Sequence, residues 1–211
     1  MFDVLRRIGE LKIVPVISLE VAADAGGLGD ALVGGGLPIA EITFRTQAAE
    51  KAIATLARRG DLLVGAGTVL NVETAKIAVG AGASFIVSPG LNPKVVGWCV
   101  DNNVPITPGV STPTEIEMAL DHGLTVVKFF PAELLGGIRM LKAISAPYPM
   151  MRFMPTGGIT PENIEEYLKF AKVIACGGTW MVSKEMLVAK QFDTIRDLSR
   201  RAVETAKRAR P

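Results

Sequence analysis

Short apolar runs rich in β-branched residues alternate with longer amphipathic stretches along the chain, and this alternation constrains the possible folds most strongly. The eight runs span residues 13–19, 39–44, 62–68, 85–89, 104–110, 126–131, 152–157 and 173–179. Strands that alternate with helices form parallel βαβ units, and eight such units close most naturally into a (β/α)₈ barrel. We therefore predict an α/β fold, a single TIM barrel with short loops. A doubly wound open sheet is the structural alternative.

Helix candidates fill the intervals between the runs, at residues 47–59, 72–79, 93–102, 113–122 and 161–169. Thr112 and Thr160 each precede a proline, a pattern that predicts an N-cap threonine with proline at the first helical position. The stretch 22–36 is an exception, because each glycine inside a helix costs about 1 kcal/mol relative to alanine. We expect the first crossover helix to be short or irregular.

The composition is typical of one globular domain, which we expect to span residues 1–211. Hydrophobic residues make up 49% of the chain, enough for a sizeable core, and no linker or low-complexity segment divides it. A net charge of +2 provides no basic footprint for nucleic acid. No apolar run has the length of a membrane span, and the N-terminal residues lack the apolar core of a signal peptide. These observations predict a cytoplasmic protein with no nucleic-acid or membrane partner.

The single histidine, His122, limits the chemistry that the chain can support. A zinc site built from several imidazoles is impossible, and Cys99 and Cys176 lack the spacing of metal ligands. We therefore predict no metal site. The two cysteines are most simply small buried hydrophobes, which fits a reducing compartment.

Charged residues inside the predicted strands mark the candidate site, because strands of a parallel sheet are usually apolar on both faces. Glu41, Thr43 and Arg45 alternate along the second strand and therefore share one face. Their position predicts a carboxylate and a guanidinium inside the barrel. A buried Glu–Arg pair that only stabilises the barrel is the alternative.

Lys128 lies between two valines and two phenylalanines of the sixth run. A charged amine is expensive to bury in such surroundings, so desolvation favours the neutral amine that Schiff-base chemistry needs. A lysine that merely pairs with an inward carboxylate is the alternative. The presence of Glu41 and Arg45 in the same barrel favours chemistry.

Two glycine-rich segments end the seventh and eighth predicted strands. In TIM barrels, the loops after these strands often bind phosphate through backbone N–H groups. A tight turn would explain either segment alone, but two at these particular strands predict a phosphate site. The candidate residues are Thr156, Gly157, Gly158, Gly177, Gly178 and Thr179. Thr68, at the end of the third strand, is either a cap or a site residue.

Six motifs occur in order along the chain: EITFRT (41–46), GAGTVL (65–70), SPG (88–90), TPG (107–109), KFFPAE (128–133) and PTGGI (155–159). Together they resemble the bifunctional 2-keto-3-deoxy-6-phosphogluconate (KDPG) aldolase / 4-hydroxy-2-oxoglutarate (KHG) aldolase family, over roughly residues 13–180. The resemblance implies a class I, Schiff-base aldolase on a TIM barrel. It also implies a homotrimer and chemistry that needs no cofactor.

The resemblance implies a role for each candidate residue. Lys128 would be the Schiff-base lysine and Glu41 the acid/base carboxylate, while Arg45 and Thr68 would hold the pyruvate carboxylate. The two glycine-rich segments would hold the substrate phosphate, and Phe130 would contact the substrate. Thr179 stands where the family often has serine, and it keeps the hydroxyl.

The implied substrates are phosphorylated and unphosphorylated 2-keto acids. KDPG would be cleaved to pyruvate and glyceraldehyde 3-phosphate, and KHG to pyruvate and glyoxylate. The galactonate epimer of KDPG is an alternative substrate, because residue types do not report one stereocentre. A phosphosugar isomerase or epimerase, with Glu41 as base and no covalent step at Lys128, is a second alternative. A non-catalytic barrel that binds a phosphorylated metabolite is a third.

Overall fold

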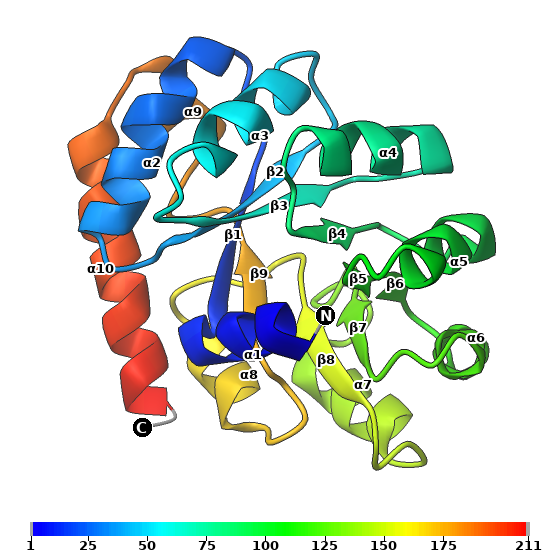
Figure 1. Ribbon diagram of the computed structural model, residues 1–211. Coiled ribbons are helices and arrows are strands. Elements are labelled where there is room, and N and C mark those ends of the chain that lie inside the picture. The colour runs from blue at the N-terminus through cyan, green and yellow to red at the C-terminus, as the bar shows by residue number, and fades with distance from the viewer. Residues whose placement is uncertain (1, 210–211) are drawn as a thin grey trace.

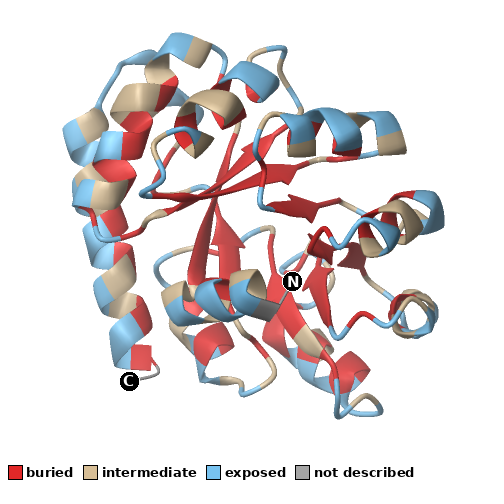
Figure 2. Cartoon of the chain, viewed as in Figure 1, coloured by how far each residue is buried: buried red, intermediate tan, exposed pale blue. Residues whose placement is uncertain are grey.

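The strands of the computed structural model, which describes residues 2–209, form a curled parallel sheet with helices around it (Figure 1). The strands are β1 (Ile13–Ile17), β2 (Ile39–Thr43), β3 (Leu63–Gly67), β4 (Phe85–Val87), β5 (Ile106–Thr107), β6 (Gly109–Val110), β7 (Val126–Phe129), β8 (Arg152–Pro155) and β9 (Cys176–Gly178). Each lies within one of the apolar runs of the sequence. The strand cores are buried, as Figure 2 shows, so the predicted apolar runs form the centre of the molecule.

The strands pair in two sheets, ordered β5-β4-β3-β2-β1-β9 and β6-β7-β8. An isolated parallel bridge between Thr156 and Gly177 links the end of β8 to β9. The single predicted run over 104–110 is divided into β5 and β6 at Pro108. Proline has no N–H to donate to a strand ladder, which explains the interruption.

The helices are α1 (Phe2–Leu11), α2 (Ala25–Gly34), α3 (Ala49–Ala57), α4 (Val72–Gly80), α5 (Pro93–Asp101), α6 (Pro113–Asp121), α7 (Gly137–Ser145), α8 (Ile164–Lys169), α9 (Lys184–Val188) and α10 (Phe192–Ala209), with a 3₁₀ turn at Ala22–Asp24. Thr112 caps α6, as predicted. The assigned helix after Thr160 starts only at Ile164, later than expected. Thr160 still makes the contacts of a cap, because its hydroxyl accepts a hydrogen bond from the Glu162 N–H at 3.3 Å and the Asn163 side chain accepts one from the Thr160 N–H at 2.9 Å.

The expectation of a short or irregular first crossover helix is wrong, because α2 is a regular helix of ten residues. Its glycines allow close packing by neighbouring elements. A Cβ on Gly27 would lie 2.7 Å from the Phe192 ring, and one on Gly29 would lie 3.0 Å from Leu56. Tertiary packing of this kind offsets the low helix propensity of glycine.

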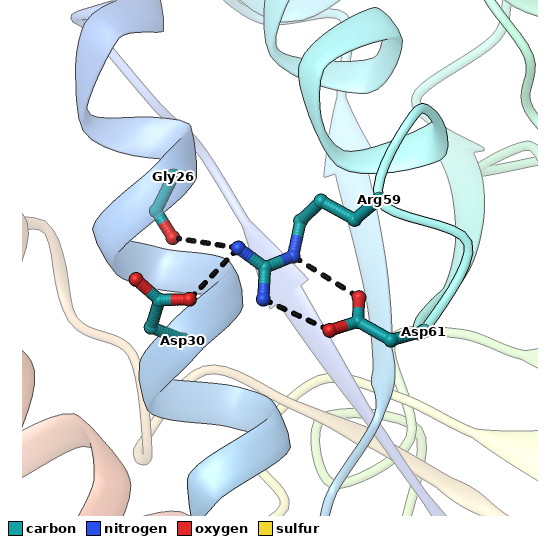
Figure 3. A network of polar contacts seen from close by, with 4 residues as sticks. All are labelled: Gly26, Asp30, Arg59 and Asp61. Atoms are coloured by element: carbon teal, nitrogen blue, oxygen red, sulfur yellow. Dashed lines mark hydrogen bonds and ion pairs between the residues drawn. The ribbon is translucent and has the colours of Figure 1, made fainter.

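Arg59 ties α2 to the chain that follows α3 (Figure 3). Its guanidinium contacts Asp30 of α2 at 2.8 Å and Asp61 at 3.0 Å. The same group donates a long hydrogen bond of 3.5 Å to the carbonyl oxygen of Gly26. These contacts add a polar restraint to the α2–α3 packing.

The hydrophobic core lies between the strands and the helices, and polar side chains within it are few. Cys99 and Cys176 are buried and unpaired, as predicted. No helix within residues 2–209 combines the length and the hydrophobicity needed to span a membrane. Glu41 and Lys128 are the two acidic or basic side chains that are buried among the described residues.

Candidate active site

A cavity of about 300 Å³ opens where the parallel strands end, and it brings together every predicted site residue. Those residues are Lys128, Glu41, Arg45, Thr68, Thr156, Gly157, Gly158, Gly177, Gly178, Thr179 and Phe130. They come from five strands and the segments that follow them. The carboxyl ends of the strands are where active sites of parallel barrels form.

Glu41 on β2 and Lys128 on β7 are both buried, with 2% and 6% of their surface exposed. Burial raises the pKa of Glu41, while the positive charges of Lys128 and Arg45 act in the opposite direction. The Lys128 amine lies 4.8 Å from the centre of the Phe130 ring. An amine and a carboxylate therefore share one desolvated cavity.

Arg45 lies beside this pair because side chains alternate along β2 and the residues that follow it. The Thr43 hydroxyl accepts a hydrogen bond from Arg45 Nε at 3.1 Å and donates one to the Ile17 carbonyl at 2.9 Å. The terminal nitrogens of Arg45 have no hydrogen-bond partner within residues 2–209. They are thus available to a carboxylate in the cavity, which a guanidinium can bind bidentately.

Gly67 ends β3 and Thr68 follows it, next to Glu41. A Cβ on Gly67 would lie 2.2 Å from Glu41 Oε1, so the glycine provides the space that the carboxylate occupies. Thr68 has a φ of 57°, the left-handed region that non-glycine residues rarely adopt. Strain of this kind often concentrates at functional sites.

The two glycine-rich segments lie side by side through the bridge between Thr156 and Gly177. Gly157 and Gly158 have φ values of 97° and 77°, a conformation that favours glycine. The N–H groups of Gly157, Gly158 and Ile159 donate to no acceptor within the described chain. Consecutive free N–H groups around a concave turn form a suitable site for an anion such as phosphate.

The cavity is also lined by four residues that the sequence did not mark as site residues: Val16, Thr43, Pro89 and Ile159. Thr43 shares a face with Glu41 and Arg45, and this signal was visible in the alternation. Pro89 and Ile159 belong to the motifs SPG and PTGGI. Val16 has no sequence signal, since an apolar strand residue at the site resembles one in the core. Residues 2–209 hold no group of three histidine, cysteine or acidic side chains placed for a metal ion.

The curled parallel sheet places a buried lysine and a carboxylate in one cavity, an arrangement that suits an α/β aldolase of the Schiff-base class. The profile of the KDPG and KHG aldolase family matches residues 4–198. The chain belongs to the KDPG and KHG aldolase family.

Curated relatives carry the same family name. The 2-dehydro-3-deoxy-phosphogluconate aldolase of Haemophilus influenzae is 49% identical over 206 residues, covering 97% of both chains. The KHG/KDPG aldolase of Escherichia coli is 42% identical over 196 residues, covering 92% of both chains.

Solved structures of related aldolases superpose closely on this chain. The KDPG aldolase of Legionella pneumophila, with pyruvate captured as a covalent carbinolamine, has a TM-score of 0.88 at 38% identity, covering 91% of this chain and 96% of that one. The Zymomonas mobilis enzyme, solved with 3-phosphoglycerate, has a TM-score of 0.87 at 36% identity, covering 94% of both chains.

Proposed function

We propose that this protein is a Schiff-base aldolase that cleaves KDPG to pyruvate and glyceraldehyde 3-phosphate, and KHG to pyruvate and glyoxylate. One observation carries the proposal: Lys128 and Glu41 are buried in the same cavity, beside Arg45 and the free N–H groups of the glycine turn. The names of the relatives support both substrates. The covalent pyruvate adduct in the Legionella enzyme supports a reaction through an amine.

The reaction begins at Lys128. The neutral amine attacks the C2 ketone of the 2-keto acid and forms a carbinolamine, which loses water to give a protonated imine. The imine withdraws electrons from the adjacent carbon, so it serves as the electron sink for bond cleavage. The centre of the Phe130 ring lies 4.8 Å from this nitrogen, so the ring forms one apolar wall beside it.

Glu41 moves the protons in the later steps. As a carboxylate, directly or through a water molecule, it removes the proton of the C4 hydroxyl, and the C3–C4 bond breaks. An aldehyde leaves, and the electron pair of the broken bond forms an enamine on Lys128. Glu41 then returns the proton to C3, and hydrolysis of the resulting imine releases pyruvate and the free amine.

The remaining residues hold the two charged ends of the substrate. Arg45 and Thr68 bind the carboxylate of the keto acid, which fixes C2 next to the amine. The phosphate is bound by the glycine-rich segments, with residues Thr156, Gly157, Gly158, Gly177, Gly178 and Thr179. KHG has no phosphate, so it uses only the first set of contacts.

Borohydride trapping tests the covalent mechanism. Pyruvate with borohydride should add mass to Lys128 in the wild type, and Lys128→Met should show neither the adduct nor cleavage while remaining folded by circular dichroism. Glu41→Gln should still form the adduct but turn over slowly. Absence of an adduct at Lys128 would reject the imine and favour an isomerase or epimerase without a covalent step.

A pyruvate-release assay coupled to lactate dehydrogenase tests the substrate. KDPG, its galactonate epimer and KHG should be compared side by side, and we expect KDPG to be cleaved faster than its epimer. Ligand binding with no pyruvate release from any of the three would instead indicate a non-catalytic binding barrel.

We also propose that the two sheets form one closed TIM barrel, with β5 and β6 as one interrupted strand, in a single domain over residues 1–211. The strand order and the bridge between β8 and β9 support this closure, and the neighbour order differs from that of a doubly wound sheet.

A homotrimer and a cytoplasmic location remain predictions. Light scattering during size-exclusion chromatography measures the first of these, and a mass of one or two chains would reject the trimer.

A further inference from the structure

A second hollow, of about 160 Å³, lies outside the curled sheet among α8, α10 and the segment after β9. We call it the outer pocket. Its apolar walls are Pro161, Ile164, Trp180, Leu198 and Ala202. None of these residues lines the substrate cavity, so the outer pocket is a separate site.

The size of the outer pocket matches one six-membered ring. An engineered apolar cavity of about 150 Å³ in another protein holds benzene. Trp180 adds an aromatic wall, and aromatic rings prefer edge-to-face or offset contacts with such a wall. A single aromatic ring therefore fits both the volume and the lining.

Arg201 supplies the polar part of the outer pocket. It forms no ion pair or hydrogen bond within residues 2–209, whereas its neighbours Arg196 and Arg200 on α10 both pair with Asp197. Thr205 also lines the pocket and lies four residues further along the helix, on the same face as Arg201. Its hydroxyl accepts a hydrogen bond from Arg208 at 3.0 Å and keeps its own O–H to donate. An unpaired guanidinium next to a hydroxyl suits a carboxylate, which it can bind with two parallel hydrogen bonds.

We propose that the outer pocket binds a small aromatic carboxylate, with its ring against Trp180 and its carboxylate on Arg201 and Thr205. Small-molecule sites are typically apolar hollows on which a small number of polar groups converge. The inference concerns a site outside the substrate cavity and does not depend on the proposed reaction.

Trp180 provides a direct readout of binding. The chain has two tryptophans, so Trp98→Phe leaves Trp180 as the only one. Phenylacetate titrated into this variant should give a saturable change in tryptophan fluorescence. The neutral analogue phenylacetamide should bind about tenfold more weakly, because it lacks the charge that pairs with Arg201.

Two matched substitutions in the Trp98→Phe background locate the carboxylate. Arg201→Gln should weaken phenylacetate about tenfold and leave aldolase turnover unchanged. Arg200→Gln removes the same charge from the adjacent position, which pairs with Asp197 and does not line the pocket, so it should leave the affinity unchanged.

Several results would overturn the proposal. These are the absence of a saturable signal, equal affinity in the Arg201→Gln variant, or an equal loss in the Arg200→Gln variant. Competition by pyruvate, or loss of the signal in Arg45→Gln, would place the probe in the substrate cavity instead. A signal that follows protein concentration and not phenylacetate would mean that a second copy of the chain fills the pocket.

Discussion

At the residue scale, Gly67 determines where the carboxylate of Glu41 can lie. A Cβ at this position would approach Glu41 Oε1 to 2.2 Å, and the side chain would have to move away. We expect Gly67→Ala to lower kcat by about tenfold to a hundredfold, because small displacements of a reacting group have effects of this size. The melting temperature should also fall, since the atoms that must move, Glu41 Cγ at 2.8 Å among them, belong to a buried side chain. Pyruvate release and thermal denaturation measure the two effects.

Gly80 provides a control for Gly67. It lies in α4 with no atom within 4 Å of an added Cβ, so Gly80→Ala should keep full activity. Full activity in Gly67→Ala would contradict the positioning role of Gly67.

Burial of Glu41 has a consequence for the pH dependence of stability. Burial raises the pKa of Glu41, so the folded state binds this proton more tightly than the unfolded state does. The stabilisation that comes from this tighter proton binding is therefore fully present below the pKa of Glu41 in the unfolded state, about 4.3. It is lost as the pH rises through the pKa of Glu41 in the folded state. We expect Glu41→Gln to gain stability relative to the wild type as the pH rises from acidic to neutral. Urea denaturation across this range tests the trend, and a difference independent of pH would contradict it.

At the scale of a single element, the start of α6 shows how a local sequence signal acts. The Thr112 hydroxyl accepts a hydrogen bond from the Glu115 N–H, and the Glu115 carboxylate accepts one from the Thr112 N–H. We expect Thr112→Ala to reduce the free energy of unfolding by about 1 kcal/mol, because the helix loses its N-cap. Chemical denaturation measures the change. Thr114→Ala, within the first turn but without a capping contact, is the control and should change stability much less.

Other elements show where local signals stop being sufficient. The Thr160 hydroxyl accepts a hydrogen bond from the Glu162 N–H as a cap does, yet the regular helix starts only at Ile164. In α2 the local propensity is poor, and packing against Phe192 and Leu56 overcomes it. In α2, contacts that a propensity scale does not include decide the outcome.

At the scale of the whole molecule, α2 and α10 lie side by side, so elements from opposite ends of the chain pack together (Figure 1). Gly35, the C-cap residue of α2, makes this approach possible. A Cβ on Gly35 would lie 2.6 Å from the carbonyl oxygen of Arg196 and 2.7 Å from Ser199 Cβ.

We expect Gly35→Ala to reduce the free energy of unfolding by about 1–3 kcal/mol, because the backbone of α10 must move to admit the methyl group. Gly34→Ala is the matched control. Its Cβ would meet only the flexible side chain of Arg196 at 3.3 Å, so stability should be equal or higher. Urea denaturation of both variants measures the difference, and equal stability of the two would contradict the packing role of Gly35.

The sequence alone determined the alternation of strands and helices, and it marked the candidate site residues that the fold brings into one cavity. Both inferences rest on local sequence signals. The hydrophobic periods of strands and helices differ, and a charged residue such as Lys128 or Glu41 stands out inside an apolar strand. Only the tertiary structure decided that Gly67 makes room for Glu41, that α2 is regular, and that Arg201 remains unpaired beside Trp180. These features depend on atoms far apart in the chain that meet only once the sheet has curled, so no local pattern encodes them.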